Sequence, residues 1–158
     1  PLCIDTANPE ALEAALKLYP GKALINSANG EEKSLSSILP LAKEYNAVVI
    51  GLCMDDDGIP PTPEGRLEVA KKIIQRATDL GIPVEDIVID PLAMTMGADH
   101  LAGSVVLETT KLLVKELGVN ITMGSSNVSF GIPDRKYLNP EPDVRPCSSV
   151  FSFVFGSG

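Results

Sequence analysis

Four apolar, strand-like runs of this chain end on an acidic or amide side chain, and these side chains are the strongest candidates for chemistry. The four residues are Asp5, Asn26, Asp90 and Asn127. Side chains at the carboxyl ends of parallel strands converge on one crevice. A carboxylate there accepts two parallel hydrogen bonds from an amidine-like edge, while a carboxamide both donates and accepts. The pattern predicts a site for a flat, nitrogen-rich ligand, and the pyrimidine half of a pterin or of guanine has the matching edge.

A simpler interpretation of these four residues is helix capping. Aspartate and asparagine favour the positions where a loop starts and where a helix is capped. Each of the four, taken alone, fits capping about as well as it fits ligand binding. Their occurrence at four equivalent strand ends favours a shared site.

Two further residues, Ser126 and Arg135, are candidates for substrate binding. Ser126 lies in the stretch 124–127, whose backbone N–H groups offer a short nest for an anionic group. Arg135 follows a turn and can contact an anionic tail of the ligand. A lone arginine after a turn is, however, more often a solvated charge.

An acidic turn, Asp55 to Asp57, follows the third apolar run at the same expected edge. It suits a lid, a contact to a substrate tail or a divalent cation. A solvated turn before the helix cap at Thr62 is the favoured interpretation. The one histidine, His100, is interpreted as a residue of a surface loop.

The composition excludes several classes of function. A net charge of −8, from 21 acidic and 13 basic residues, argues against a nucleic-acid groove. No apolar run approaches the length of a membrane span and no signal peptide precedes Pro1, so a cytoplasmic protein without a membrane partner is expected. The three cysteines, Cys3, Cys53 and Cys147, are expected to be reduced and buried. With a single histidine and no CxxC spacing, no metal site is expected.

Short apolar runs alternate regularly with amphipathic stretches along the chain. Asn8 with Pro9, and Thr62 with Pro63, carry the signature of a helix start. The strands are expected to end at Asp5 and to cover 22–26, 47–53, 87–90 and a segment from about 120, with helices over 8–19, a stretch containing 35–42, 62–80 and about 103–117.

This β–α alternation, repeated four times and followed by a fifth strand, predicts a parallel α/β architecture. A closed (β/α)8 barrel normally needs about 250 residues and eight strands. The sheet is therefore either open or part of a barrel, over residues 1–139. Residues 140–158, with three prolines and then three phenylalanines, break the repeat and form an atypical tail, interpreted as a truncated or frame-shifted end.

Several short motifs together resemble a known family, the pterin-binding methyltransferases. They are LCIDTANP at residues 2–9, LINS at 24–27, GLCMD at 51–55, IDPL at 89–92 and SNVSFG at 126–131. The resemblance covers residues 1 to about 139 in the right order and is strongest to the methyltetrahydrofolate:corrinoid-protein (cobalamin) methyltransferases.

The resemblance implies a (β/α)8 TIM barrel that binds a pterin at its carboxyl-terminal mouth, with about the third to seventh strands present in this chain. It implies that Asp5, Asn26 and Asp90 hold the pterin ring and that Asn127 is catalytic, beside the methyl-bearing nitrogen. The implied reaction transfers the methyl group of methyltetrahydrofolate to the cobalt(I) of a corrinoid on a partner protein. The full-length parent is expected to be a homodimer.

Two alternatives remain open at this point. Dihydropteroate synthase shares the barrel and much of the pterin pocket, but its release of diphosphate requires lysine or arginine at the barrel mouth. Residues 123–130 contain no basic residue, which favours methyl transfer. The other alternative is an inactive pterin-binding fragment, whose open sheet edges would favour association.

Overall fold

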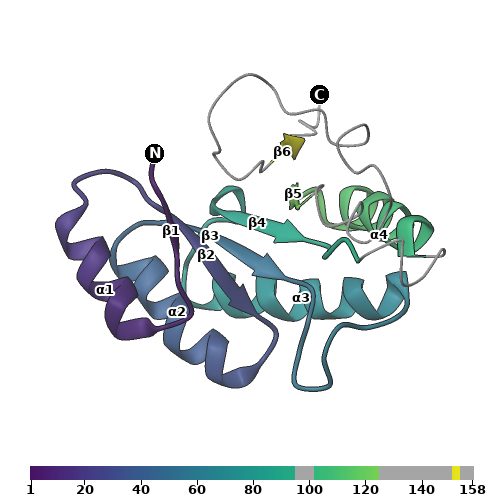
Figure 1. Ribbon diagram of the computed structural model, residues 1–158, viewed down its shortest axis with the longest axis horizontal. Coiled ribbons are helices and arrows are strands. Elements are labelled where there is room, and N and C mark those ends of the chain that lie inside the picture. The colour runs from purple at the N-terminus through teal and green to yellow at the C-terminus, as the bar shows by residue number, and fades with distance from the viewer. Residues whose placement is uncertain (95–101, 125–150, 154–158) are drawn as a thin grey trace, which may run out of the picture.

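The computed structural model describes residues 1–94, 102–124 and 151–153, the last of these as backbone only. The strands are β1 (Cys3–Asp5), β2 (Leu24–Asn29), β3 (Val48–Leu52), β4 (Ile87–Asp90), β5 (Asn120–Met123) and β6 (Phe151–Phe153). The helices are α1 (Pro9–Leu18), α2 (Glu32–Glu44), α3 (Pro63–Asp79) and α4 (Ala102–Leu117), with a short 3-10 turn at Val84–Asp86 before β4. Figure 1 shows this arrangement.

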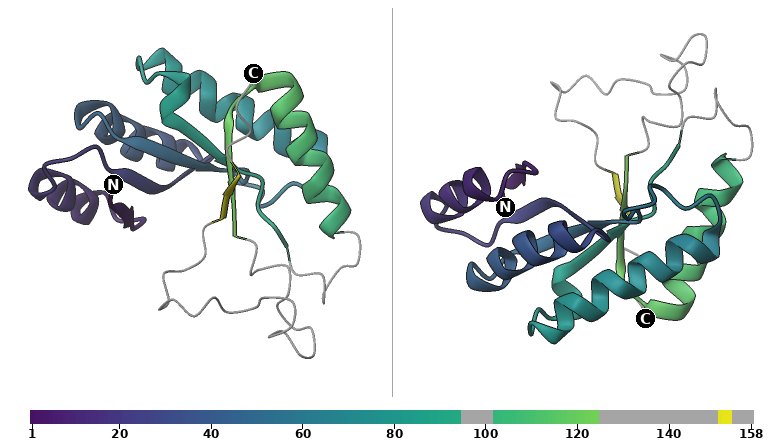
Figure 2. Two further views of the ribbon diagram at one scale, coloured as in Figure 1. Left: turned by 90° about the horizontal axis from the view of Figure 1, so that it is seen from above. Right: turned by 90° about the horizontal axis from the view of Figure 1, so that it is seen from below.

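The order of the strands distinguishes a barrel segment from a doubly wound sheet. Strands β1 to β5 lie side by side in chain order and are parallel, while β6 pairs antiparallel with β5. Parallel crossovers are almost always right-handed, so a strand order that never reverses places every connecting helix on the same face. The four helices indeed lie along one side of the curved sheet (Figure 2). This is the topology of a (β/α)8 barrel cut open, since a doubly wound sheet needs a reversal of strand order.

The two predicted helix starts are confirmed. Asn8 Oδ1 accepts hydrogen bonds from the backbone N–H groups of Glu10 (2.9 Å) and Ala11 (3.1 Å) at the start of α1. Thr62 Oγ1 accepts one from Gly65 N (3.2 Å) at the start of α3. These caps satisfy backbone donors that have no partner inside the helix.

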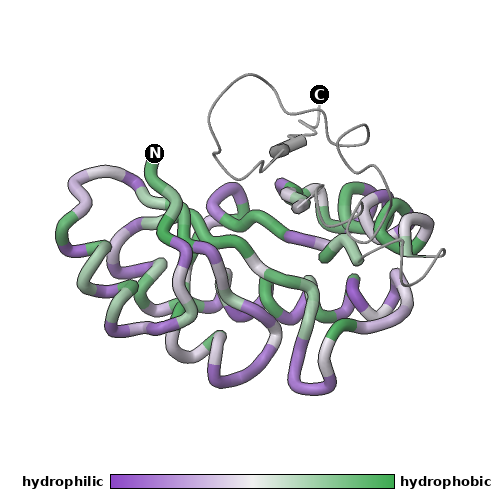
Figure 3. The backbone as a smooth tube through the Cα atoms, viewed as in Figure 1, coloured by the Kyte–Doolittle hydropathy of each residue, from purple (hydrophilic) through white to green (hydrophobic). Residues whose placement is uncertain are grey.

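The hydrophobic core lies between the sheet and its helices. Successive strand residues point to opposite faces, and the residues of β1 to β5 on the helix-facing side are buried, except Met123 at the end of β5, which is half-buried. The buried ones are Ile4, Ile25, Ala28, Val49, Gly51, Ile87, Ile89 and Ile121. They pack against the apolar stripes of the helices, among them Leu35 and Leu39 of α2 and Ala70 and Ile73 of α3. In Figure 3 the apolar colour follows the strands.

The opposite face of the sheet, called the inner face here, carries no helix of the described chain. Ile50 is buried there, but Val48 and Leu52 are only half-buried. The expectation that residues 47–53 form a strand covered on both faces is therefore met at Ile50 and wrong at the strand ends. The expectation of buried cysteines is likewise correct for Cys53 and wrong for Cys3, which lies exposed on the inner face of β1.

The second strand is longer than the sequence predicts. The expected strand ends at Asn26, whereas β2 continues to Asn29. The pairing of β2 with β3 shifts between Ile25 and Ala28, so that Asn26 and Ser27 both lie opposite Ile50. One extra residue in a strand is a β-bulge, and it allows the chain to continue in the sheet beyond the polar residue.

No helix in residues 1–94 or 102–124 is long and apolar enough to cross a membrane. The ionic contacts on the helices are mostly at the surface, as in the pairs Lys71–Glu68 and Arg76–Glu32. Such exposed pairs each contribute about 0–1 kcal/mol, so burial of the apolar face is the main source of stability.

Gly51 allows the close approach of α3 to β3 and generates a first prediction. A Cβ atom at this position would lie 2.9 Å from Ile73 Cγ2 and 3.2 Å from Ile89 Cδ1. We expect Gly51→Ala to lower the free energy of unfolding by about 1–3 kcal/mol through overpacking, measured by urea denaturation. Combining it with Ile73→Ala should cost less than the sum of the two single variants. Strictly additive losses would show that this contact does not limit the packing.

Candidate functional site

The candidate site lies on the inner face at the carboxyl ends of β1 to β5. Asp5 and Asn26 are direct register partners on β1 and β2, and the Thr6 N–H donates to the Asn26 carbonyl oxygen (3.0 Å). The Asp5 side chain is exposed and the Asn26 side chain is half-buried. The structure therefore brings these two predicted residues together, and the bulge in β2 begins at Asn26, where it can re-aim the side chain.

Asp90 lies on the same face, two strands from Asn26. It is the last residue of β4, as predicted, and is the register partner of Leu52 on β3. Asp90 therefore lies one layer of side chains nearer the carboxyl edge of the sheet than Asp5 and Asn26 do. Three of the four predicted strand-end residues thus share one face.

The hydrogen bonds of Asp90 argue against the capping interpretation. Its Oδ1 accepts from the backbone N–H of Leu92 (2.8 Å), within a local turn. The next helix, α4, begins only at Ala102, so Asp90 does not cap it. Among the described residues, no group donates to Oδ2. The carboxylate is held by one oxygen and can offer the other to a ligand.

Burial raises the pKa values of two groups in this part of the site. Partial burial raises the pKa of Asp90, while the Leu92 N–H and the charge of Arg66 act in the opposite direction. Burial, and then the nearby Asp90 carboxylate, raises the pKa of the Cys53 thiol to about 12. Cys53 is therefore a protonated core residue and not a nucleophile.

Arg66 is a residue of this region that the sequence interpretation missed. Its side chain is only 3% exposed, and the guanidinium donates to three backbone carbonyls: Nε to Pro60 O (2.9 Å) and Nη1 to Pro91 O (2.8 Å) and Leu92 O (2.9 Å). A signal for it exists in the sequence. Arg66 occupies the buried stripe of α3, four residues before Ala70 and seven before Ile73, where a cation requires fixed acceptors.

Thr122 is a second residue that the sequence interpretation missed. It follows Ile121 on β5, which pairs with Ile89 on β4, so Thr122 lies beside Asp90 on the inner face. The residue is 4% exposed, and its Oγ1 has no hydrogen-bond partner in the part of the chain that the structure describes. Buried hydroxyls almost always have a partner, so Thr122 is a polar position beside Asp90 whose bonding the described residues leave incomplete.

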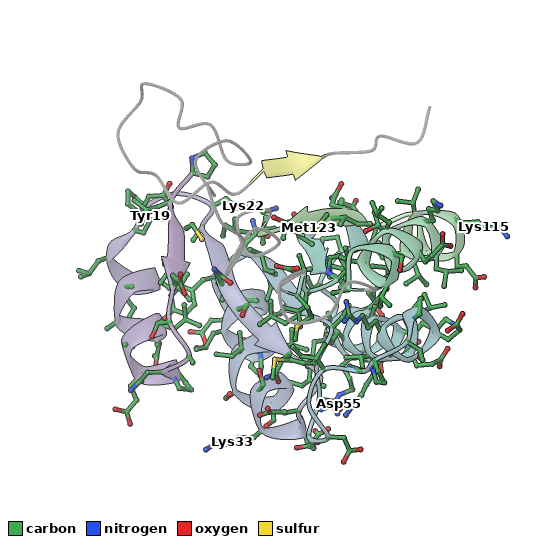
Figure 4. All side chains as sticks on the ribbon, turned by 45° about the vertical axis from the view of Figure 1, so that its right-hand side comes forward. Tyr19, Lys22, Lys33, Asp55, Lys115 and Met123 are labelled. Carbon is green, nitrogen blue, oxygen red and sulfur yellow. The ribbon has the colours of Figure 1, made fainter. Side chains whose placement is uncertain are left out.

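The acidic turn after β3 forms bonds within itself. Asp55 and Gly58 exchange backbone hydrogen bonds (3.0 and 2.9 Å), and Asp55 Oδ1 accepts from Asp57 N (3.1 Å). Gly58 adopts φ 96°, a value that glycine tolerates. Asp56 and Asp57 are exposed, as the favoured interpretation of a solvated turn expects. The described ranges contain no group of three or more potential metal ligands. Figure 4 shows Asp55 beyond the carboxyl end of β3, with Lys22 at the opposite end of the sheet.

Five residues of the sequence analysis lie outside the described residues. They are His100, Ser126, Asn127, Arg135 and Cys147. The site as described therefore consists of Asp5, Asn26 and Asp90, with Thr122 and Arg66 next to Asp90.

Comparisons with known proteins identify the family of the chain as a whole. A family model described as pterin binding enzyme matches residues 1–154. The methylcorrinoid:tetrahydrofolate methyltransferase of Eubacterium limosum is 32% identical over 144 residues, which cover 88% of this chain and 52% of that protein. The methionine synthases of Mycobacterium tuberculosis and Mycobacterium leprae are 29% and 30% identical over 143 residues, covering 84% of this chain and 12% of each synthase.

The chain spans about half the length of the first of these relatives and a smaller part of the synthases. The predicted fold class, a partial barrel of the pterin-binding type, is confirmed by the family match together with the unreversed order of the parallel strands. Because the family model matches nearly the whole chain, the chain belongs to the family of pterin-binding enzymes.

Proposed function

We propose that this chain binds methyltetrahydrofolate at the inner carboxyl edge of the sheet and serves, in its full-length parent, the transfer of a methyl group to the cobalt(I) of a corrinoid protein. The observation that carries the proposal is the placement of Asp5, Asn26 and Asp90 on one face at that edge. The relatives support methyl transfer, since one is named for methylcorrinoid and tetrahydrofolate and two are methionine synthases.

The pyrimidine half of the pterin provides the groups that these side chains recognise. It presents an N–H and an amino group side by side, and a carboxylate accepts both in parallel. Asp90, with Oδ2 unused by the described residues, is the better placed acceptor, because partial burial strengthens its hydrogen bonds. Asn26 supplies both a donor and an acceptor for the remaining ring atoms. Asp5, which is more exposed, offers a further acceptor on the solvent side of the ring.

The transfer step requires help at the nitrogen that loses the methyl group. The electron pair of cobalt(I) forms the new bond to carbon, and the carbon–nitrogen pair returns to the pterin. A neutral tertiary amine is a poor leaving group, so a proton or a hydrogen bond must reach that nitrogen as the bond breaks. We call Asp5, Asn26 and Asp90 together the pterin clamp, and we assign to its two carboxylates the orientation of the ring. We assign the hydrogen bond at the nitrogen to Asn127, with Ser126 and Arg135 as further contacts to the substrate.

The proposal includes a corrinoid protein as the partner and a homodimeric parent. It favours methyl transfer over dihydropteroate synthase, because the relatives reported above are methyltransferases and methionine synthases. The discriminating assay supplies either methyltetrahydrofolate with cob(I)alamin or aminobenzoate with the pterin diphosphate. Turnover in the second mixture alone would overturn the assignment.

The charge of Asp90 should decide pterin affinity. Asp90→Asn keeps an oxygen for the Leu92 N–H but removes the charge that strengthens the ligand bonds. We expect methyltetrahydrofolate affinity, measured by calorimetric titration at pH 7, to fall roughly tenfold to a hundredfold, corresponding to about 1.5–3 kcal/mol. In the unsubstituted chain the affinity should decrease as the pH falls, and earlier than for an ordinary carboxylate, because burial raises the pKa of Asp90.

Asp56→Asn is the matched control for this variant. Asp56 is exposed in the acidic turn near the same edge, so its substitution removes the same charge without touching the clamp. Equal losses in the two variants would mean that only the overall charge matters.

Asn127 should affect the rate of transfer more than binding. We expect Asn127→Ala to lower the single-turnover rate of methyl transfer to cob(I)alamin by about 10²–10³-fold, the usual loss for a transition-state hydrogen-bond donor. Methyltetrahydrofolate affinity should change far less. An unchanged rate constant, followed through the absorbance of cobalt(I), would remove Asn127 from the mechanism.

Thr122→Val should separate stability from binding. Valine has the same shape and removes a hydroxyl that has no partner among the described residues, so the free energy of unfolding without ligand should rise by about 1 kcal/mol. Affinity for methyltetrahydrofolate should fall in the same variant. Thr109→Val is the control, because the buried Thr109 hydroxyl already donates to Val105 O (2.7 Å) and its removal brings no gain. A destabilised Thr122→Val variant with full affinity would contradict this role.

A further inference from the structure

One peptide group separates the buried guanidinium of Arg66 from the half-buried carboxylate of Asp90. The carbonyl oxygen of Pro91 accepts from Arg66 Nη1 (2.8 Å), and the N–H of the same peptide, on Leu92, donates to Asp90 Oδ1 (2.8 Å). The guanidinium and the carboxylate thus contact opposite ends of the peptide between residues 91 and 92.

The same guanidinium also binds the next peptide, between residues 92 and 93, and the loop before α3. Arg66 Nη1 also binds Leu92 O (2.9 Å), and Nε binds Pro60 O (2.9 Å) in the loop that leads into α3. Leu92 adopts φ 61°, in the left-handed region that residues with a Cβ rarely occupy. Such a conformation persists where the surrounding bonds determine it, and here the bonds come from Arg66 and Asp90.

We propose that Arg66 is a positioning residue for the pterin clamp: it orients and polarises the 91–92 peptide, which in turn fixes the Asp90 carboxylate with Oδ2 toward the ligand. A cation at the carbonyl oxygen makes the N–H at the other end of the peptide a stronger donor, since hydrogen bonds in a chain reinforce one another. The peptide therefore transmits part of the attraction of an ion pair without direct contact between the charges. The ligand named in this inference rests on the proposed function; the positioning of Asp90 does not.

The surroundings of Asp90 leave Arg66 as its principal charged neighbour within the described residues. Arg66 on α3 and Cys53 after β3 are the titratable groups that interact with it. The thiol of Cys53, with a pKa of about 12, is uncharged over the working range. Removal of the arginine charge thus leaves the Asp90 carboxylate without its neighbouring cation and with a weaker, less ordered donor.

The test follows the ionisation of Asp90 directly in Arg66→Gln. Carbon-13 NMR of protein labelled at the aspartate carboxyl carbons reports each titration, and Asp90→Asn assigns the Asp90 signal. We expect the pKa of Asp90 to rise in Arg66→Gln, and the pH profile of methyltetrahydrofolate affinity to move upward with it, with an affinity loss of about tenfold at pH 7. Arg66→Lys, which keeps the charge but on a single donor nitrogen, should recover part of both.

Arg76→Gln is the matched control. Arg76 is a partly exposed arginine on the same helix, paired with Glu32 (2.7 Å), so its substitution removes the same charge away from the site. It should leave the Asp90 titration and the pH profile unchanged. An Arg66→Gln protein that stays folded and shows an unchanged Asp90 titration overturns the inference, even if its affinity falls.

Two further outcomes separate this inference from the proposed function. An upward shift of the Asp90 titration in a chain that binds no methyltetrahydrofolate supports the positioning role and counts against the proposed function alone. If Arg66→Gln does not fold, as circular dichroism would show, Arg66→Lys provides the test. A smaller upward shift then supports the inference, and an unchanged titration overturns it.

Discussion

Packing of the helices against one face of a parallel sheet determines what each strand residue can do. Side chains of a strand alternate between faces, so residues on the helix-facing side, such as Ile25, Val49 and Ile89, must be apolar and are fully buried. Residues on the inner face are released from that requirement. Asp5, Asn26 and Asp90 occupy this face at the carboxyl edge, where polar groups remain within reach of a ligand.

The same constraint explains why polar groups are tolerated so close to the core. Asp90 follows two buried isoleucines of β4, and its burial is compensated by a hydrogen bond from the 91–92 peptide and by the charge of Arg66. Arg66 in turn replaces its lost hydration with three carbonyl oxygens. Thr122, beside them, lacks such compensation among the described residues. The region combines satisfied and unsatisfied polar groups, as binding sites commonly do.

The sequence predicts the short-range features of this fold well. The caps at Asn8 and Thr62 depend on residues two or three positions away, and the alternation of strands and helices follows from local periodicity. The ends of β1 and β4 at Asp5 and Asp90 are predictable for the same reason.

Features that depend on pairing between distant segments were not predictable. The bulge at Asn26 arises because two residues of β2, Asn26 and Ser27, lie opposite one residue of β3. The sequence of either strand alone does not reveal this mismatch. The role of Arg66 depends on carbonyls 25 and 26 residues further along the chain. The exposure of Cys3 likewise depends on which face of β1 the helices cover, because its neighbour Ile4 takes the covered side.

The measurement that tests the central claim most directly is a titration of ¹⁵N-labelled chain with methyltetrahydrofolate, followed by the backbone amide resonances. The pterin clamp predicts saturable shifts that concentrate at the carboxyl ends of β1, β2 and β4, including the amides of Thr6 and Leu92, whose hydrogen bonds adjoin the clamp. The outward surfaces of α1 to α4 should stay unchanged. Shifts confined to the helices, or no saturable shifts from a folded chain, would contradict it.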